Sequence, residues 1–161
     1  FSFKKGYFVF YYLIDMFSKA TEYALRATIY IAQKGSEEKK IGIKEIAKAI
    51  DSPLSFTAKI MQSLTGLNAV VCSVRGPKGG FYLTETEKAL PSRAILKAMG
   101  EDEMLSQCVL GLKKCSEVNP CPMHFQYQPI KQELISLFAN KTIQQLADEM
   151  NNGQVFIKNR K

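Results

Sequence analysis

Three of the four cysteines and the only histidine of this 161-residue chain lie within one short stretch. Six residues separate Cys108 from Cys115, five separate Cys115 from Cys121, and two separate Cys121 from His124. Glycine, asparagine and proline recur through the stretch, which predicts a loop between two helices. Such a loop can bring three thiolates and one imidazole around a single centre.

Three thiolates and an imidazole form a ligand set that proteins use for metals. A Cys3His shell binds zinc, and cysteine together with histidine also ligates iron–sulfur clusters. The spacing is looser than the CxxC pairs of common zinc folds, which suits a cluster wider than one ion. The simpler alternative is three unrelated free thiols and a solvated histidine, but their concentration in one loop favours a metal. Cys72 lies outside the stretch and is expected to be a packed side chain.

The composition limits the class of protein. Hydrophobic residues make up 46% of the chain and charged residues 23%, as in soluble globular proteins. The length suits one domain, or a small domain with an extension for dimerisation. A net charge of +7 favours a polyanionic partner. Because the cysteines do not form a disulfide framework and no secretory signal is evident, we expect a cytoplasmic protein.

Residues 1–15 differ from the rest of the chain, since they hold seven of its 17 aromatic residues. Their apolar run, residues 7–14, is far shorter than the ~20 residues that span a bilayer. We therefore expect no membrane partner. Met16 is the expected start of the natural protein, with residues 1–15 as upstream or added sequence. The intact mass of natively expressed protein tests this expectation.

Two short helices joined by a tight turn predict a helix-turn-helix. After a first helix over about 16–33, apolar residues from Ile43 to Ile50 have helical spacing, and Asp51-Ser52-Pro53 forms the turn. The next helix, residues 53–67, is expected to bury Phe56, Ile60, Leu64 and Leu67. Its other face would present a small, polar and partly basic surface to a DNA major groove; this surface comprises Ser55, Thr57, Ala58, Lys59, Gln62 and Ser63.

A basic β-hairpin is predicted directly after this helix. The β-rich runs 70–74 and 80–84 flank the segment Arg75-Gly76-Pro77-Lys78-Gly79. Arg75 and Lys78 are placed to meet phosphates or to enter the minor groove, and the glycines permit close backbone approach. An ordinary surface hairpin is the alternative, but the position after a helix-turn-helix on a basic chain favours a DNA-binding wing.

The C-terminal half is expected to be helical on either side of the cysteine loop. Pro91 opens a helix that ends at Gly100, an acidic link leads into the loop, and Thr142 can cap a last helix. The helix between, residues 125–139, is apolar on more than one face, which favours a homodimer seam; its seam residues are Ile130, Leu134, Ile135, Leu137 and Phe138. The predicted division is therefore 1–15 extension, 16–100 DNA-binding domain, 101–124 cysteine loop, 125–150 dimerisation and C-terminal helices, and 151–161 polar tail.

These motifs together resemble the winged-helix regulator family typified by the iron–sulfur cluster regulator IscR and the nitric-oxide sensor NsrR. The resemblance runs from Ser18 to about Met150 and is carried by SKATEYALRA at 18–27, PLSFTAKIMQSL at 53–64, SVRGPKGGFYL at 73–83 and the three cysteines. It implies a mainly α fold with a small β wing and a long dimerisation helix. It also implies that the three cysteines hold a [2Fe–2S] or [4Fe–4S] cluster, which tunes the affinity for promoter DNA.

The resemblance leaves the fourth ligand open between two residues. His124 matches the IscR-like arrangement and is preferred, whereas other relatives use a carboxylate from the partner's first helix, a position that Glu22 matches here. The six-residue first gap is one longer than the five common in the family. Within the recognition helix, Ala58-Lys59 replaces the Glu-Gln of the cluster-assembly regulators, so their operator does not carry over.

The function expected from the sequence is that of a homodimeric, redox-, nitric oxide- or iron-sensing repressor or activator of transcription. The residues expected to contact double-stranded promoter DNA are Ser55, Phe56, Thr57, Lys59, Gln62, Arg75, Gly76 and Lys78. One alternative is a regulator with structural zinc or no metal, controlled by another ligand or partner. An enzyme is disfavoured, because no CxxC, nucleotide-binding loop or acid–base constellation is present. A pure protein-interaction module is the remaining alternative.

Overall fold

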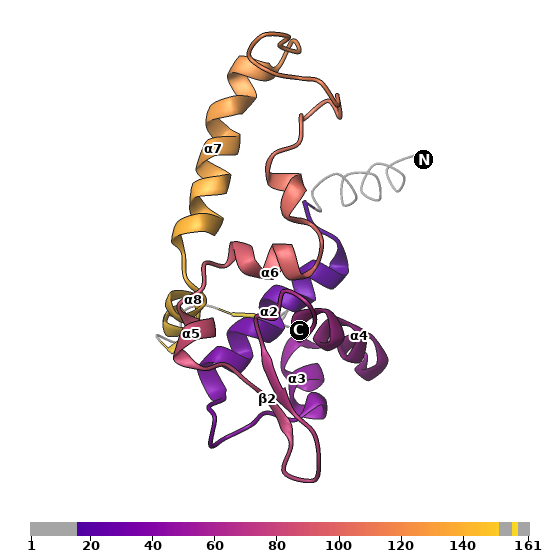
Figure 1. Ribbon diagram of the computed structural model, residues 1–161, viewed down its shortest axis with the longest axis vertical. Helices are drawn as coiled ribbons and strands as arrows, with labels where there is room; N and C mark the ends of the chain where they lie inside the picture. The colour runs from indigo at the N-terminus through magenta and orange to yellow at the C-terminus, as the bar shows by residue number, and fades with distance from the viewer. Residues whose placement is uncertain (1–15, 152–155, 158–161) are drawn as a thin grey trace, which may run out of the picture.

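The computed structural model describes residues 16–151 and 156–157. The expectations for residues 1–15 and for most of the polar tail lie outside these residues. A head of helices carries a β-hairpin at one end of the molecule, and a long helix rises from the head to a loop at the other end (Figure 1). Among the described residues, no helix is both long enough and apolar enough to cross a membrane.

Helix α2, Lys19–Lys34, is the centre of the head. Ser18 caps it by accepting a hydrogen bond from the backbone N–H of Thr21. Small side chains at Ala24 and Ala27 are fully buried, so neighbouring helices can approach α2 closely. The helix predicted over about residues 16–33 is thus confirmed, but it begins at Lys19, after the capping residue Ser18.

The predicted helix-turn-helix is present as α3, Ile43–Ile50, and α4, Leu54–Leu64. Asp51 ends α3 in the left-handed region with φ 57°, which turns the chain sharply. Helix α4 ends three residues earlier than predicted. The expectation that Leu67 is buried is wrong, because it falls in the turn after α4 and its side chain is fully exposed.

The wing consists of β1, Cys72–Val74, and β2, Gly80–Tyr82, paired antiparallel. Ile41 adds a third short segment, since its backbone exchanges two hydrogen bonds with that of Phe81. A Cβ atom on Gly80 would lie 2.8 Å from the carbonyl oxygen of Ile41. This glycine therefore lets the wing lie against the segment that leads into α3.

The chain after the wing builds the platform from which the long helix rises. Helix α5, Glu85–Lys88, and the 3₁₀ helix η1, Asp102–Leu105, were not predicted; both are only one turn long. Between them lies α6, Arg93–Ala98, the helix predicted from Pro91. Arg93 on α6 forms a two-pronged ion pair with Asp102 on η1, at 2.6 and 3.1 Å.

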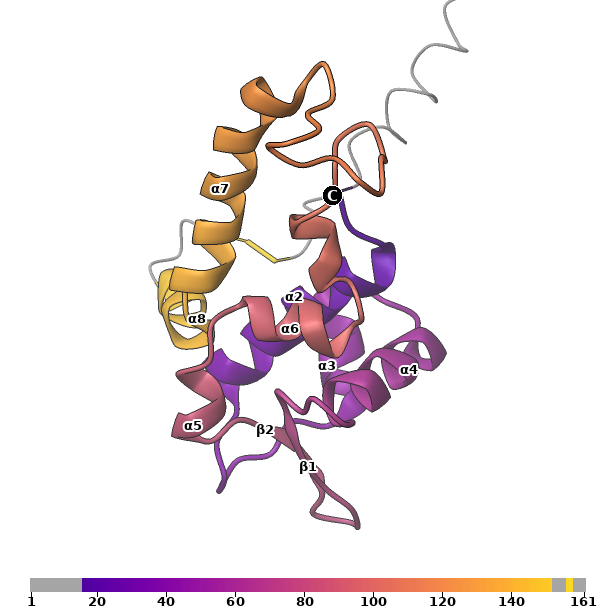
Figure 2. The same ribbon diagram turned by 45° about the horizontal axis from the view of Figure 1, so that its top comes forward.

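Helix α7, His124–Asn140, stands away from the head, as both views show (Figures 1 and 2). None of its residues is buried. At its base, Leu134, Ile135 and Phe138 pack against a small cluster of Phe17, Leu96 and Leu105.

The last helix, α8, Ile143–Asn151, returns to the head and packs along α2, where Ile143 and Ala147 are buried. Thr142 caps α8 as predicted, accepting from the backbone N–H of Gln145. Both ends of α7 are thereby tied to the head, one through α8 and one through the cysteine loop.

Candidate functional site

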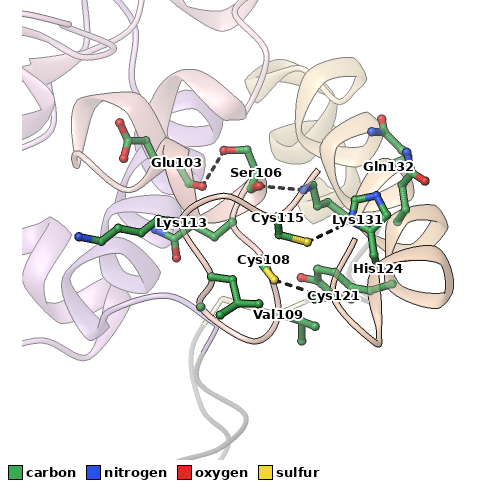
Figure 3. A pocket seen from close by; sticks show the side chains of 15 residues that line it. Glu103, Ser106, Cys108, Val109, Lys113, Cys115, Cys121, His124, Lys131 and Gln132 are labelled. Carbon is green, nitrogen blue, oxygen red and sulfur yellow. Dashed lines mark hydrogen bonds between the residues drawn. The ribbon is translucent and has the colours of Figure 1, made fainter. Parts of the chain in front are cut away.

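The loop between η1 and α7 gathers the three cysteine thiols at one point. The sulfurs of Cys108, Cys115 and Cys121 all lie within 4.8 Å of one another, and those of Cys108 and Cys121 are 3.7 Å apart (Figure 3). All four cysteines of the chain are free thiols. The predicted convergence of the loop cysteines is present, and Cys72 lies outside it on β1.

Short hydrogen-bonded turns fold the loop around this point. The backbone N–H of Gly111 donates to the carbonyl oxygen of Cys108 at 2.8 Å, and that of His124 donates to Cys121 at 3.0 Å. The second turn leads directly into α7, so His124 stands on the first position of the helix and the turn holds Cys121 next to it. The first turn takes up three of the six residues between Cys108 and Cys115, which brings these cysteines close despite the longer gap.

His124 lies beside the sulfur cluster with one ring nitrogen lacking a partner. Its Nδ1 is 3.2 Å from the Cys115 sulfur. Its Nε2 is buried and, within the described residues, has no hydrogen-bond partner. Because buried polar atoms are almost always paired, the orphaned Nε2 indicates a partner that the described part of the chain does not supply. His124 itself lies outside the group of three sulfurs that are within 4.8 Å of one another, so a role for it as the fourth ligand stays a prediction.

The peptide groups of the loop favour the thiolate form of Cys108. The backbone N–H of Leu112, followed by that of Leu110, lowers the pKa of the Cys108 thiol to about 7. The pKa of Cys115 is raised: the backbone N–H of Cys121 lowers it, but desolvation and the neighbouring thiols together outweigh that effect. Since the thiolate is the metal-binding form, Cys108 is prepared to bind a metal near neutral pH.

The donor set fits a metal centre. A cavity of about 580 Å³ opens at the thiols and is also lined by Lys113, Tyr127 and Lys131. A tetrahedral ion bound about 2.3 Å from each sulfur holds its sulfurs about 3.8 Å apart, close to the Cys108–Cys121 separation. A cluster that shares these ligands among several irons needs a wider arrangement, which a loop can adopt.

The other proposed ligand, Glu22, lies on α2 and outside the sulfur group of its own chain. Its carboxylate forms an ion pair with Lys19 at 3.0 Å. A role as a ligand contributed by a partner subunit remains a prediction. Cys72 lies on wing strand β1, where desolvation and then Glu87 raise the pKa of its thiol. The geometry thus gives Cys72 no part in the metal centre.

Most of the residues expected to contact DNA lie on two exposed surfaces. Ser55, Lys59 and Gln62 are exposed along α4. Arg75, Gly76 and Lys78 are exposed at the wing tip, on the same end of the molecule as the helix-turn-helix (Figure 2). Two further lysines that the sequence analysis did not single out, Lys44 and Lys48, are also exposed, on α3; their i, i+4 spacing places them on the same face of this helix.

Two of the predicted DNA-contacting residues are packed within the head. The expectation that Thr57 is exposed is wrong: its side chain is fully buried, and its hydroxyl donates to the carbonyl oxygen of Pro53 at 3.0 Å. Phe56 is half-buried and packs edge-on against Tyr23 of α2, with ring centroids 5.8 Å apart. These contacts fix α4 on the head rather than offering side chains to DNA.

Comparison with known proteins shows which family of proteins this chain resembles. Residues 17–149 match the family Rrf2, described as an iron-dependent transcriptional regulator. A putative HTH-type transcriptional regulator of Aquifex aeolicus is 34% identical over 133 residues, which cover 81% of this chain and 90% of that protein. The HTH-type transcriptional regulator IscR of Yersinia pseudotuberculosis is 26% identical over 80% of this chain and 77% of that protein.

Two solved structures have a similar fold. CymR, the global cysteine regulator of B. subtilis, superposes with a TM-score of 0.66 at 20% identity, covering 83% of this chain and 96% of CymR. IscR of T. potens superposes with a TM-score of 0.63 at 18% identity, covering 86% of this chain and 90% of that one. At these identities the likeness concerns the fold alone, and it confirms a winged helix with a small two-stranded wing.

Proposed function

This chain belongs to the Rrf2 family of iron-dependent transcriptional regulators, and from that premise we propose that it is a homodimer whose promoter affinity is tuned by a metal centre at Cys108, Cys115, Cys121 and His124. The family and the curated relatives are transcriptional regulators and not enzymes. The observation that carries the metal proposal is the gathering of three free thiols within 4.8 Å of one another.

Docking on DNA uses α4 and the wing. Helix α4 lies in the major groove with Ser55, Lys59 and Gln62 toward it, while Arg75 and Lys78 meet the adjacent backbone or minor groove. The exposure of these five side chains, on a chain of net charge +7, supports this docking. Such binding weakens steeply with added salt, because released counterions dominate it.

The dimer forms along α7. This 17-residue helix has no buried residue, and its apolar side chains Ile130 and Leu137 are 61% and 57% exposed. A groove of about 840 Å³ runs beside them, lined also by Met104, Tyr127 and Leu134. A second copy of α7 covers this apolar surface in the proposed dimer and places two recognition helices on one face of DNA.

The residues around the loop connect the metal centre to the head. The amino group of Lys131 on α7 donates to the carbonyl oxygen of Ser106 at 2.7 Å, two residues before Cys108. The preceding turn, η1, is held to α6 by the Arg93–Asp102 pair. A carboxylate oxygen of Glu101 accepts from the backbone N–H of Ser18, the residue that caps α2. A change in the loop can therefore shift α2, on which α4 is packed.

An iron–sulfur cluster, when bound, supplies a centre whose charge and integrity respond to oxidation, nitric oxide and iron shortage. The chain's own part is to hold it through three thiolates and His124, and to convert its presence into a tilt of α4. A coupling of ~1–3 kcal/mol changes operator affinity about 5–150-fold.

A single zinc ion is the second candidate. The 3.7 Å separation of the Cys108 and Cys121 sulfurs favours it, since this is close to the edge of a zinc tetrahedron. In that case the loop has a structural role, and regulation comes from another ligand or partner.

One preparation separates the two candidates. The protein is purified without oxygen, its iron, sulfide and zinc are quantified, and its absorption spectrum and affinity for its own promoter DNA are recorded before and after metal removal. Iron with sulfide, and a change in affinity on removal, support the cluster proposal. Zinc at one per subunit without iron supports the second candidate, and unchanged affinity after metal removal contradicts regulation by the metal centre.

A further inference from the structure

One large apolar side chain of the recognition helix α4 lies outside the hydrophobic core of the head. Leu54 is the first residue of α4, and its side chain is 45% exposed. The buried face of α4 consists of Thr57, Ile60, Met61 and Leu64, each at most 1% exposed. Unlike Phe56, Leu54 is not among the partly buried side chains that pack against the head core.

The position of Leu54 places it at the edge of the face proposed to meet DNA. Helical periodicity sets Leu54 beside Ala58, one turn later, because residues four apart are neighbours on a helix. Ala58 is itself half-buried, and the exposed Ser55 and Gln62 continue the surface on the polar side. The strip that Leu54 and Ala58 form is therefore apolar, and neither of these two side chains offers a hydrogen-bond donor or acceptor.

The major groove presents one apolar group that such an edge can contact. Each thymine carries a 5-methyl group there, whereas the other base edges present mainly donors and acceptors. In helix-turn-helix proteins it is the N-terminal part of the recognition helix that reaches base edges. An exposed leucine at this place loses solvent contact when it meets a methyl group, and it leaves no polar group unpaired.

We propose that Leu54 is a specificity-determining residue that contacts the 5-methyl group of a thymine in the major groove, with Ala58 lining the same contact. The proposal rests on the docking of α4 proposed above and names the base chemistry that this docking reads. The proposal also gives Ala58 a role, because a small apolar side chain at this position leaves room for the methyl group.

The test removes only the methyl group. A duplex is first selected by the protein from a random-sequence pool, and each thymine in it is then replaced by uracil, which pairs identically but lacks the methyl. For the wild-type protein we expect one thymine per half-site at which uracil weakens binding about fourfold, the equivalent of ~0.8 kcal/mol for one buried methyl. Leu54→Ala should bind the thymine duplex more weakly and show no further loss with uracil.

Leu67→Ala is the matched control, because Leu67 is a fully exposed leucine beyond the other end of α4. It should retain the full sensitivity to uracil. Thermal unfolding of each variant identifies any loss of folded protein. The uracil substitutions measured with the wild-type protein do not depend on the folding of any variant.

The outcomes separate this inference from the function on which it rests. If no duplex is enriched from the pool, the proposed docking on DNA is wrong. If a duplex is enriched but uracil is tolerated at every position, or Leu54→Ala remains as sensitive to uracil as the wild type, DNA docking stands and the thymine contact is refuted.

Discussion

At the scale of single residues, the three loop cysteines have the clearest consequences. Replacing Cys108, Cys115 or Cys121 by Ala removes one of three strong ligands, so we expect protein purified without oxygen to lose most of its iron and visible absorption. Cys72→Ala is the matched control, since it removes a thiol outside the group. Metal analysis and absorption spectra measure the result. Full iron content in any one of the three loop variants would contradict its assignment as a ligand.

His124→Ala should be milder than the cysteine substitutions. Water or an added thiol can replace a neutral imidazole, so the expected result is a metal centre that forms but is lost faster. Glu22→Ala tests the other candidate ligand in the same assay. If Glu22→Ala destabilises the centre and His124→Ala does not, the fourth ligand comes from α2 rather than from α7.

Arg75 and Lys59 test the two DNA-contacting surfaces one side chain at a time. If Arg75 reaches a base edge, Arg75→Ala costs about 1–3 kcal/mol of binding. Lys59→Ala should weaken binding and reduce its salt dependence by about one counterion. Lys97→Ala is the control, because Lys97 is an exposed lysine on α6. Salt titrations of affinity for selected duplexes measure these effects, and unchanged affinity in both variants would contradict the docking.

At the scale of elements, the wing depends on how closely its base meets the segment before α3. In Gly80→Ala, the new Cβ lies 2.8 Å from the Ile41 carbonyl oxygen, at a φ of 153° that L residues rarely adopt. We expect the wing to shift and DNA affinity to fall about tenfold or more, at a stability cost of ~1–3 kcal/mol. Gly42→Ala, where the Cβ meets open space, is the control. DNA titration and thermal unfolding measure both.

The ion pair between η1 and α6 provides a test of coupling. Asp102→Asn breaks a two-pronged contact whose side chains are 30% and 25% exposed, worth about 1 kcal/mol. We expect the metal centre to form normally, while the ratio of DNA affinities with and without metal shrinks by up to about fivefold. Asp148→Asn, on the outer face of α8, makes the same chemical change elsewhere. An undiminished ratio in Asp102→Asn would locate the coupling in another contact.

At the scale of the whole molecule, α7 decides the oligomeric state. The base of α7 packs within its own chain through Leu134 and Ile135, so a charge there would disturb the subunit as well as the seam. Ile130 and Leu137 are more exposed and test the dimer more cleanly. Ile130→Glu or Leu137→Glu would place a charge in the buried seam, and we expect monomers with weakened DNA binding. Sedimentation measures the oligomeric state of each variant, and Gln132→Glu is the control. A seam variant that remains dimeric would place the seam elsewhere.

The sequence by itself determined the order of the elements and the chemistry of the sites. Helical spacing from Ile43 to Ile50, the turn at Asp51-Ser52-Pro53 and the glycine-rich wing all depend on local backbone preferences, which are readable from neighbouring residues. The ligand types in the loop were equally readable. One-turn elements such as α5 and η1 were not, because a single turn leaves too little periodicity to detect.

Only the tertiary structure decided the exact limits of the face that each element buries. Thr57 and Leu67 were assigned to the wrong surfaces because the buried side of α4 is set by how the helix packs on α2 and α3, and this packing is not a property of the α4 residues alone. The same holds for the convergence of the sulfurs and for the orphaned Nε2 of His124, since the turns of the loop set both. Helical spacing did predict the burial of Ile60 and Leu64, but the complete set of buried residues is a property of the assembled chain.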